Sequence, residues 1–255
     1  MLSSSLRVLG VVPARLKSTR LPDKMLADLH GRPMIAVTAA SARNSAAFSQ
    51  VVVATDSQRI VDAVEGYGFK AFLTDPELTS GTARVAEVAK QIDADVYVNI
   101  QGDEPLIDGE GLRRVVDSFV EDSVEMASLW FPLTEEDEKN PNTVKVVLDA
   151  QQFALYFSRS LIPFPRNWDL FDPKKHLGVY GYRRDTLLKL VELESCDLER
   201  IESLEQLKAL YYGIRIKMVR AARDSLGVDT HADLEKVRQI LKSRHDQGNT
   251  DKGAA

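Results

Sequence analysis

The 255-residue sequence predicts an α/β protein with a mostly parallel, mixed sheet and a smaller β-rich part in its second half. In the first half, short apolar runs alternate with helical patterns. In the second half, strand-like runs follow one another with few helices between them. A hydrophobic fraction of 44% is enough for a sizeable core. We therefore expect one large domain that carries an insertion, and we see no repeat and no linker between domains.

The first half contains three short β-rich runs, at 7–12, 50–55 and 95–100. They lack a strict alternation of apolar and polar residues, which is typical of strands covered on both faces. Helical patterns lie between and after them, at 33–43, 57–67 and 83–91. This β-α-β-α order predicts a parallel sheet with right-handed crossovers.

The second half predicts strands at 125–133, 144–149, 153–159 and 176–183, with a loop rich in proline and aromatic residues at 161–175. Strands without intervening helices indicate antiparallel additions to the sheet or a flap. We place this flap at roughly 125–185.

Helical patterns return near the C-terminus. One apolar stripe spans 198–211, formed by Ile201, Leu204, Leu207, Leu210 and Tyr211. A second helix is predicted to begin at Thr230 as N-cap, with Asp233 three residues later as in a capping box. The polar end predicts a domain at 1–245 and a disordered tail at 246–255.

Charge and composition exclude several functions. A net charge of -5 argues against nucleic-acid binding, which needs a broad basic face. No apolar run approaches the roughly 20 residues of a membrane span. The single cysteine, Cys196, excludes an internal disulfide. We expect a cytoplasmic protein that binds neither nucleic acid nor membrane.

Polar loops follow all three strands of the first half. The basic run Arg15, Lys17, Arg20 and Lys24 comes after the first, the dipeptide TD after the second and QGDEP after the third. Ligands of parallel sheets bind beyond the carboxyl ends of the strands. The three loops are therefore expected to form one site.

The basic run contains no glycine, so it is neither a Walker loop nor a dinucleotide fingerprint. Its cations, hydroxyls and backbone N–H groups nevertheless suit a triphosphate. By itself, the run is equally consistent with a solvated loop. Asp103 and Glu104 follow a buried strand close to this run, which suggests a bridging Mg²⁺. The SGTAR segment at 80–84 adds a glycine turn at a helix start, suited to a base or a phosphate.

In order and at matching spacing, PARLKSTRLPDK, VVVATD, SGTAR, VNIQGDEPLI, NPNTVKVVLD, HLGVYGYR, LEQLKALYYG and GVDTHADLEKV resemble the 3-deoxy-manno-octulosonate cytidylyltransferases, the CMP-Kdo synthetases. The resemblance extends from about residue 11 to about residue 241. QGDEP and SGT are shared with CMP-sialic acid synthetases, whereas LGVYGYR and LEQLKALYYG are more particular to the Kdo enzymes.

The resemblance implies a fold of the nucleotide-diphospho-sugar transferase type, with a flap that mediates formation of a homodimer. It implies condensation of CTP with Kdo to give CMP-Kdo and pyrophosphate, with Mg²⁺ as cofactor, for lipopolysaccharide biosynthesis. The anomeric hydroxyl of the sugar would attack the α-phosphorus, and no side-chain base is required.

The resemblance also assigns site residues. The nucleotide site comprises Arg15, Ser18, Arg20, Lys24, Ser80, Gly81, Thr82, Arg84 and Gln101. The sugar site comprises Gln101, Arg159, His176, Tyr182, Glu202 and Gln206. Asp103 and Asp229 hold the metal and form the catalytic set together with Arg15 and Lys24. Lys17 receives no role. Without the resemblance, each residue assigned only to the sugar is better explained as solvated or structural.

Two positions depart from the family pattern. Ala83 stands where an acidic residue is usual, and Met25 stands where proline is common. The loss of an acid beside the nucleotide loop leaves open whether the sugar is Kdo or its 8-amino analogue. Two alternatives remain: CMP activation of another acidic sugar, such as a sialic acid, and a non-catalytic nucleotide-binding protein. The presence of both metal carboxylates and of the triphosphate cations argues against the second.

Overall fold

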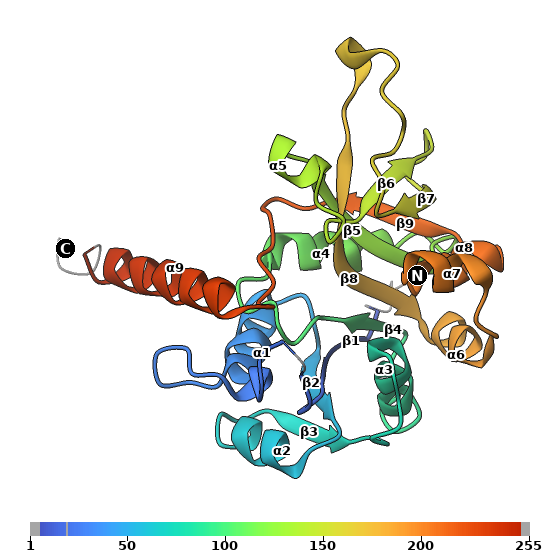
Figure 1. Ribbon diagram of the computed structural model, residues 1–255. Coiled ribbons are helices and arrows are strands. Elements are labelled where there is room, and N and C mark those ends of the chain that lie inside the picture. The colour runs from blue at the N-terminus through green and yellow to red at the C-terminus, as the bar shows by residue number, and fades with distance from the viewer. Residues whose placement is uncertain (1–5, 19, 251–255) are drawn as a thin grey trace.

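The computed structural model describes residues 6–18 and 20–250. Its centre is a nine-stranded sheet with the strand order β3-β2-β1-β4-β8-β5-β9, and β6 and β7 lie off this path (Figure 1). The first four strands are β1 (Val8–Ala14), β2 (Gln50–Thr55), β3 (Lys70–Leu73) and β4 (Val96–Asn99). They pair in parallel, as the alternating pattern predicted.

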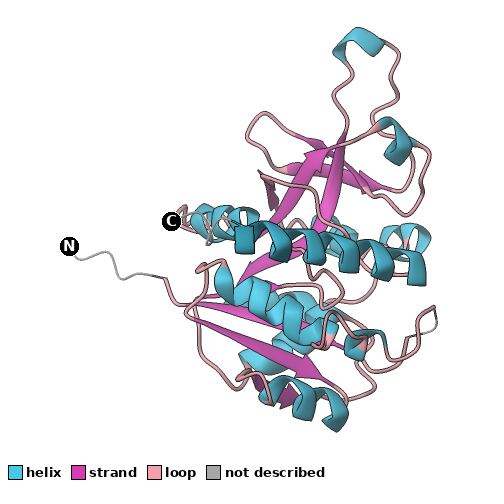
Figure 2. Ribbon diagram, turned by 90° about the vertical axis from the view of Figure 1, so that its left-hand side faces the viewer, coloured by secondary structure: helices cyan, strands magenta, loops and turns pink. Residues whose placement is uncertain are grey.

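Helices cover both faces of this sheet (Figure 2). α1 (Met34–Asn44), α2 (Gln58–Glu65), α4 (Gly109–Ser118) and α9 (His231–Thr250) contribute to the core on one face. α3 (Gly81–Ala89), α6 (Arg184–Glu192) and α8 (Gln206–Tyr211) contribute to the core on the other. Every residue of β1 and β4 is buried, which explains why these strands show no apolar–polar alternation. β3, α4 and β9 (Ile216–Arg220) were not predicted.

The sheet continues with β8 (Lys174–Arg183), antiparallel to β4, and β5 (Met126–Pro132), antiparallel to β8. The edge strand β9 runs parallel to β5. The sheet is therefore mixed, as predicted.

The bounds of the flap, 125–185, stay a prediction, and the strands of this region belong to the same nine-stranded sheet. The register of β5 against β8 shifts between Ser128 and Leu129. From Met126 to Ser128, β5 pairs with the part of β8 that also pairs with β4. On the other side of the shift, β8 also pairs with β6 (Lys145–Leu148), which pairs with β7 (Ala154–Ser158). The part that projects in Figure 1 includes α5 (Glu135–Glu138) and the short 3-10 helix η2 (Trp168–Leu170).

The predicted helix at 198–211 is two helices, α7 (Asp197–Glu202) and α8. Ser203 lies between them with a left-handed φ of 51° and changes the chain direction. The prediction of a single apolar stripe is therefore wrong. Leu207 is buried, whereas Ile201 is 78% exposed and Tyr211 is 60% exposed.

The capping box at the start of α9 is confirmed. Asp233 Oδ2 accepts hydrogen bonds from the N–H and the hydroxyl of Thr230, and Thr230 Oγ1 accepts from Asp233 N–H. The structure describes α9 as far as Thr250, beyond the predicted start of the tail at 246. Residues 251–255 of the predicted tail lie outside the described residues.

Within the described part of the chain, no helix is both long enough and apolar enough to cross a membrane.

Candidate active site

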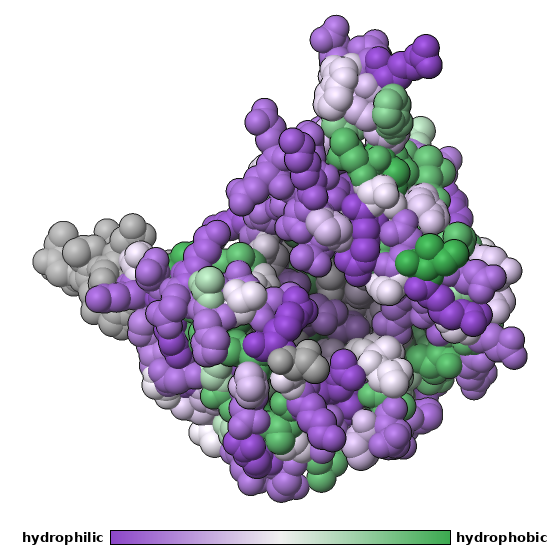
Figure 3. Space-filling view, in the orientation of Figure 1, coloured by the Kyte–Doolittle hydropathy of each residue, from purple (hydrophilic) through white to green (hydrophobic). Residues whose placement is uncertain are grey.

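A polar cavity of about 710 Å³ opens at the carboxyl ends of the parallel strands. It appears as a recess between the lower body and the flap (Figure 3). Its walls are the loop after β1, the start of α3, the loop after β4 and the segment before α9. Among the predicted site residues, the lining contains Arg15, Ser18, Arg20, Lys24, Gly81, Arg84, Gln101, Asp103 and Asp229. The predicted convergence of the loops after β1 and β4 is confirmed.

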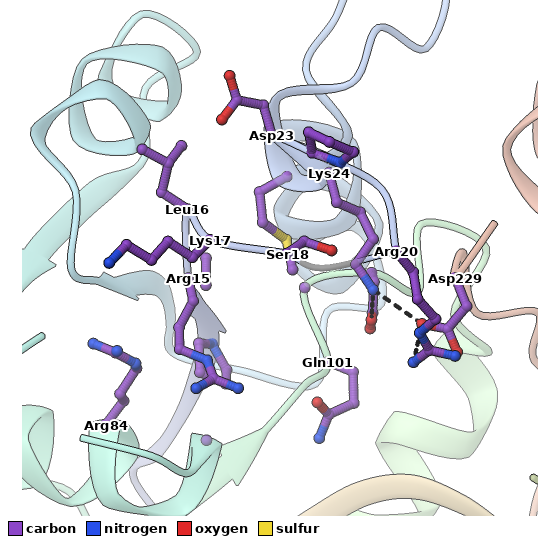
Figure 4. A pocket seen from close by; sticks show the side chains of 17 residues that line it. Arg15, Leu16, Lys17, Ser18, Arg20, Asp23, Lys24, Arg84, Gln101 and Asp229 are labelled. Carbon is purple, nitrogen blue, oxygen red and sulfur yellow. Dashed lines mark hydrogen bonds and ion pairs between the residues drawn. The ribbon is translucent and has the colours of Figure 1, made fainter. Parts of the chain in front are cut away.

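The basic loop is held in place from β2. The backbone N–H of Leu16 donates to Asp56 Oδ1 at 3.0 Å, and Asp56 belongs to the TD dipeptide that follows β2. At its other end the loop enters the short 3-10 helix η1 (Lys24–Leu26). The side chains of Arg15, Arg20 and Lys24 extend from this loop around the cavity (Figure 4).

Two carboxylates from opposite halves of the chain lie close together. Asp103 follows β4, Asp229 precedes α9, and the N–H of Val228 donates to the carbonyl oxygen of Asp103 at 2.9 Å. The Nζ of Lys24 lies 2.5 Å from Asp103 Oδ2 and 3.2 Å from Asp229 Oδ1 (Figure 4). Nη2 of Arg20 lies 3.0 Å from the same oxygen of Asp229.

The chemistry of this pair suits Mg²⁺. Magnesium prefers hard oxygen ligands, and protein sites often supply one or two carboxylates and leave the remaining positions to phosphate and water. The described residues contain no group of three or more His, Cys, Asp or Glu side chains able to hold a metal. Two carboxylates are too few to complete a magnesium site, so the pair fits this metal only where phosphate or water oxygens supply the remaining ligands.

The SGT segment begins α3. Ser80 is the N-cap, and its Oγ accepts from Ala83 N–H at 3.1 Å. Gly81 packs closely on Asn99 and Pro13, since a Cβ at Gly81 would lie 3.3 Å from both side chains. Glycine at this position therefore lets the start of α3 pack closely against β1 and β4. Gly81 also lines the cavity, and a helix N-terminus suits a polar or anionic ligand.

Arg84 lines the cavity, and its hydrogen bonds and ion pair are with other residues of the protein. Its side chain is only 1% exposed, and Nη2 lies 3.2 Å from Asp56 Oδ2. Nη1 donates to Thr74 Oγ1 and to the carbonyl oxygen of Asp75. Burial lowers the pKa of Arg84, and the Asp56 carboxylate opposes that shift. Arg84 thereby fixes Asp56, which in turn fixes the basic loop at Leu16.

The residues assigned to the sugar are only partly brought together. Gln101 lines the cavity, and its Nε2 donates to Gly178 O at 3.1 Å. Tyr182 is buried, and its hydroxyl lies 3.2 Å from Thr82 Oγ1. His176 Nε2 lies 2.8 Å from Ser128 Oγ, and burial lowers the pKa of His176 to about 3, which keeps the ring neutral.

Arg159 and Glu202 contact each other at the base of the flap, outside the cavity lining. Glu202 Oε2 accepts from Arg159 N–H at 3.0 Å, and Glu202 Oε1 accepts from Ser158 Oγ at 2.6 Å. Gln206 lies on α8, is 4% exposed, and its Nε2 has no partner among the described residues. The sequence had indicated that Glu202 and Gln206 are neighbours on one helix face. This is wrong, because Glu202 ends α7 and Gln206 begins α8.

Several residues hold the segment that precedes Asp229. The sequence assigned no role to three of them, Lys175, Asp224 and Ser225. Lys175 Nζ lies 2.6 Å from Asp224 Oδ2, and Ser225 Oγ donates to Glu104 Oε2 at 2.6 Å. Burial raises the pKa of Glu104 to about 7. The QGDEP motif pointed to Glu104 as an acid near the metal, but only the fold shows that Ser225 comes to it.

The match to a family model described as cytidylyltransferase covers residues 9–216. The chain is 48% identical to a 3-deoxy-manno-octulosonate cytidylyltransferase of Chloroherpeton thalassium, over 92% of this chain and 97% of that protein. It is 43% identical to one of Koribacter versatilis, over 95% and 93% of the two chains.

Comparison with solved structures supports the same family. A CMP:2-keto-3-deoxy-manno-octonic acid synthetase complexed with CTP superposes with a TM-score of 0.90 at 40% identity and covers 93% of this chain and 99% of its own. A 4-diphosphocytidyl-2C-methyl-D-erythritol synthase of Anaerococcus prevotii, at 12% identity, has a TM-score of 0.63, covers 94% of this chain and 100% of its own, and shares the fold alone. The chain therefore belongs to the 3-deoxy-manno-octulosonate cytidylyltransferase family.

Proposed function

We propose that this protein transfers the CMP part of CTP to the anomeric hydroxyl of Kdo and releases pyrophosphate. The observation that carries the proposal is one cavity in which three cations of the β1 loop, Arg15, Arg20 and Lys24, surround two acids, Asp103 and Asp229. A triphosphate needs the cations, and a divalent metal needs the acids. The names of the relatives supply the sugar.

In this proposal the triphosphate lies along the β1 loop and the cytidine at the start of α3. Gly81 lines the cavity there, and the predicted contacts of its neighbours Ser80 and Thr82 rest on the resemblance. The predicted roles of Arg84 and of the other nucleotide contacts stay predictions; the contacts of Arg84 favour an indirect one, through Asp56.

The reaction is an in-line displacement. The anomeric hydroxyl oxygen forms a bond to the α-phosphorus, and its proton passes to solvent water. The bond from the α-phosphorus to the bridging oxygen of the β-phosphate breaks, and pyrophosphate leaves with that electron pair. Arg15, Arg20 and Lys24 neutralise the negative charge that develops on the leaving group. Asp103 and Asp229 would hold Mg²⁺, which when bound polarises the phosphate and lowers the pKa of the attacking hydroxyl.

Gln101 is the residue best placed for the sugar, because it borders both the cavity and β8. One N–H of its side-chain amide donates to Gly178 O, which leaves the second N–H and the side-chain carbonyl oxygen to bond sugar hydroxyls. The predicted sugar contacts of Arg159, His176, Tyr182, Glu202 and Gln206 rest on the resemblance.

We also propose that the protein works in the cytoplasm as a homodimer joined through the flap. Large apolar side chains are exposed on the flap and its base, namely Leu155, Phe164, Trp168, Leu170, Ile201 and Tyr211. Figure 3 shows apolar residues gathered along this part of the molecule. Exposed apolar groups of this extent favour a protein partner, and a second copy is the partner that the resemblance implies.

The test is pyrophosphate release with CTP and Mg²⁺ and with Kdo, 8-amino-Kdo or N-acetylneuraminic acid as the acceptor. We expect turnover with Kdo and far less with the sialic acid. Turnover with the sialic acid alone, or with none of the acceptors, would contradict the proposal.

A further inference from the structure

The ammonium group of Lys24 lies between the two carboxylates assigned to the metal. It is 2.5 Å from Asp103 and 3.2 Å from Asp229, and the Lys24 side chain is only 10% exposed. Arg20 contacts the same oxygen of Asp229. In this arrangement two negative groups are paired with two positive ones, and the pair of acids carries no excess negative charge.

A divalent cation cannot share these oxygens with the ammonium group, because like charges at contact distance repel strongly. Among the described residues, no group of three or more ligating side chains forms around this pair to outweigh that repulsion. Metal binding to the nucleotide-free protein therefore requires Lys24 to leave.

A bound triphosphate offers the ammonium group of Lys24 other anionic partners. The lysine sits at the start of η1 on a flexible four-carbon stem, and its loop also carries Arg15 and Ser18 to the cavity. Phosphate oxygens bound there compete with Asp103 and Asp229 for the ammonium group. The same oxygens complete the coordination of a metal that two carboxylates alone hold weakly.

We propose that Lys24 occupies the metal position in the nucleotide-free protein and that the triphosphate of CTP draws it away, so that CTP and Mg²⁺ bind with positive coupling. Coupling of this kind is reciprocal, and each ligand raises the affinity of the other by the same factor. This inference rests on the proposed function for the identity of the nucleotide and of the metal.

The test is a titration of the purified full chain with Mn²⁺, followed by the electron paramagnetic resonance signal of free Mn²⁺, without nucleotide and without sugar. Lys24→Met should bind Mn²⁺ about tenfold or more tightly than the wild type, a typical size for a coupling between sites. Lys24→Gln serves the same purpose if methionine disturbs the loop.

Lys17→Met is the matched control. Lys17 lies on the same loop and lines the same cavity, and it makes no ion pair among residues 6–18 and 20–243. Its loss should change Mn²⁺ affinity by less than about threefold, since exposed charges are largely screened. In the double variant Lys24→Met, Asp103→Asn, the gain should disappear, which locates the metal.

Three results would overturn the inference: no gain in Lys24→Met, an equal gain in Lys17→Met, or a gain that survives Asp103→Asn. Failure of the proposed function looks different. If the wild type makes CMP-Kdo but Lys24→Met shows no gain, this inference alone fails. If the gain is present but the wild type uses none of the sugar acids, the proposed function fails.

Discussion

Val228 and Asp103 are joined by a backbone hydrogen bond of 2.9 Å, from the N–H of Val228 to the carbonyl oxygen of Asp103. This bond ties the segment before α9 to the loop after β4. Asp229 is the next residue after Val228, so the bond places the two carboxylates on the same side of the cavity. The proposed metal site thus depends on main-chain contacts that side-chain substitutions leave intact.

Asp103→Asn should lower kcat by about three decades, equivalent to about 4 kcal/mol, because it removes a charged metal ligand while preserving shape. The thermal midpoint should change by only a few degrees, and CTP should still bind, as measured by calorimetry. Asp117→Asn, on the exposed face of α4, is the control and should behave as wild type. Near-normal turnover of Asp103→Asn with Mg²⁺ would rule out its role as a ligand.

Lys24→Ala should lower kcat by two to three decades, about 2–4 kcal/mol, with a smaller effect on the KM for CTP. The reason is that its ammonium group meets charge that develops only as pyrophosphate leaves. Steady-state kinetics with varied CTP measure both constants, and Lys17→Ala is the control for charge on the loop. A rise in KM at constant kcat would show equal binding of ground and transition states.

Asp56→Ala should lower the free energy of unfolding by about 3 kcal/mol, because it leaves the buried guanidinium of Arg84 without its counter-charge. It should also raise the KM for CTP, since the N–H of Leu16 loses its acceptor. Urea denaturation measures the first effect. Glu87→Ala, which removes the exposed partner of Lys90, should cost at most about 1 kcal/mol. Equal losses in the two variants would contradict the structural role of Asp56.

Glu104→Gln should make stability less dependent on pH. Burial raises the pKa of Glu104 from 4.5 to about 7, so the folded protein holds a proton that the unfolded chain releases. The carboxyl group therefore destabilises the fold increasingly as pH rises from 4.5 to 7, by up to about 3 kcal/mol in all. In metal-free buffer, the advantage of Glu104→Gln over wild type should be absent near pH 4.5 and greatest above pH 7. An advantage that does not grow with pH would contradict the shift.

The Glu202→Gln variant distinguishes two roles for Glu202: the contacts with Ser158 and Arg159 seen in the structure, and the sugar contact that the resemblance implies. The carboxylate of Glu202 accepts bonds from Ser158 and Arg159. We therefore expect kcat/KM to fall by less than about tenfold, the cost of one weakened hydrogen bond to a charged group. The fall should be the same for Kdo and for 8-amino-Kdo. A clearly larger loss with the amino sugar would show that Glu202 faces the sugar ammonium group instead.

The layout of the first half could be predicted from the sequence alone. The buried runs that became β1, β2 and β4, and the helices between them, follow from local periodicity. The place of Arg15, Lys24 and Asp103 at one sheet edge follows from the rule that carboxyl ends of parallel strands share an edge. The ordered motifs that resemble Kdo cytidylyltransferases added Asp229, which local patterns could not connect to Asp103.

The partners of the polar side chains, in contrast, became visible only in the folded chain. The sequence offered Arg84 as a nucleotide contact, but the approach of β2 and of residues 74–78 buried it against Asp56. One left-handed residue, Ser203, separated Glu202 from Gln206. Periodicity is a local property and shows which face of an element is apolar. The partner of a buried charge depends on which segment, distant in the sequence, packs beside it.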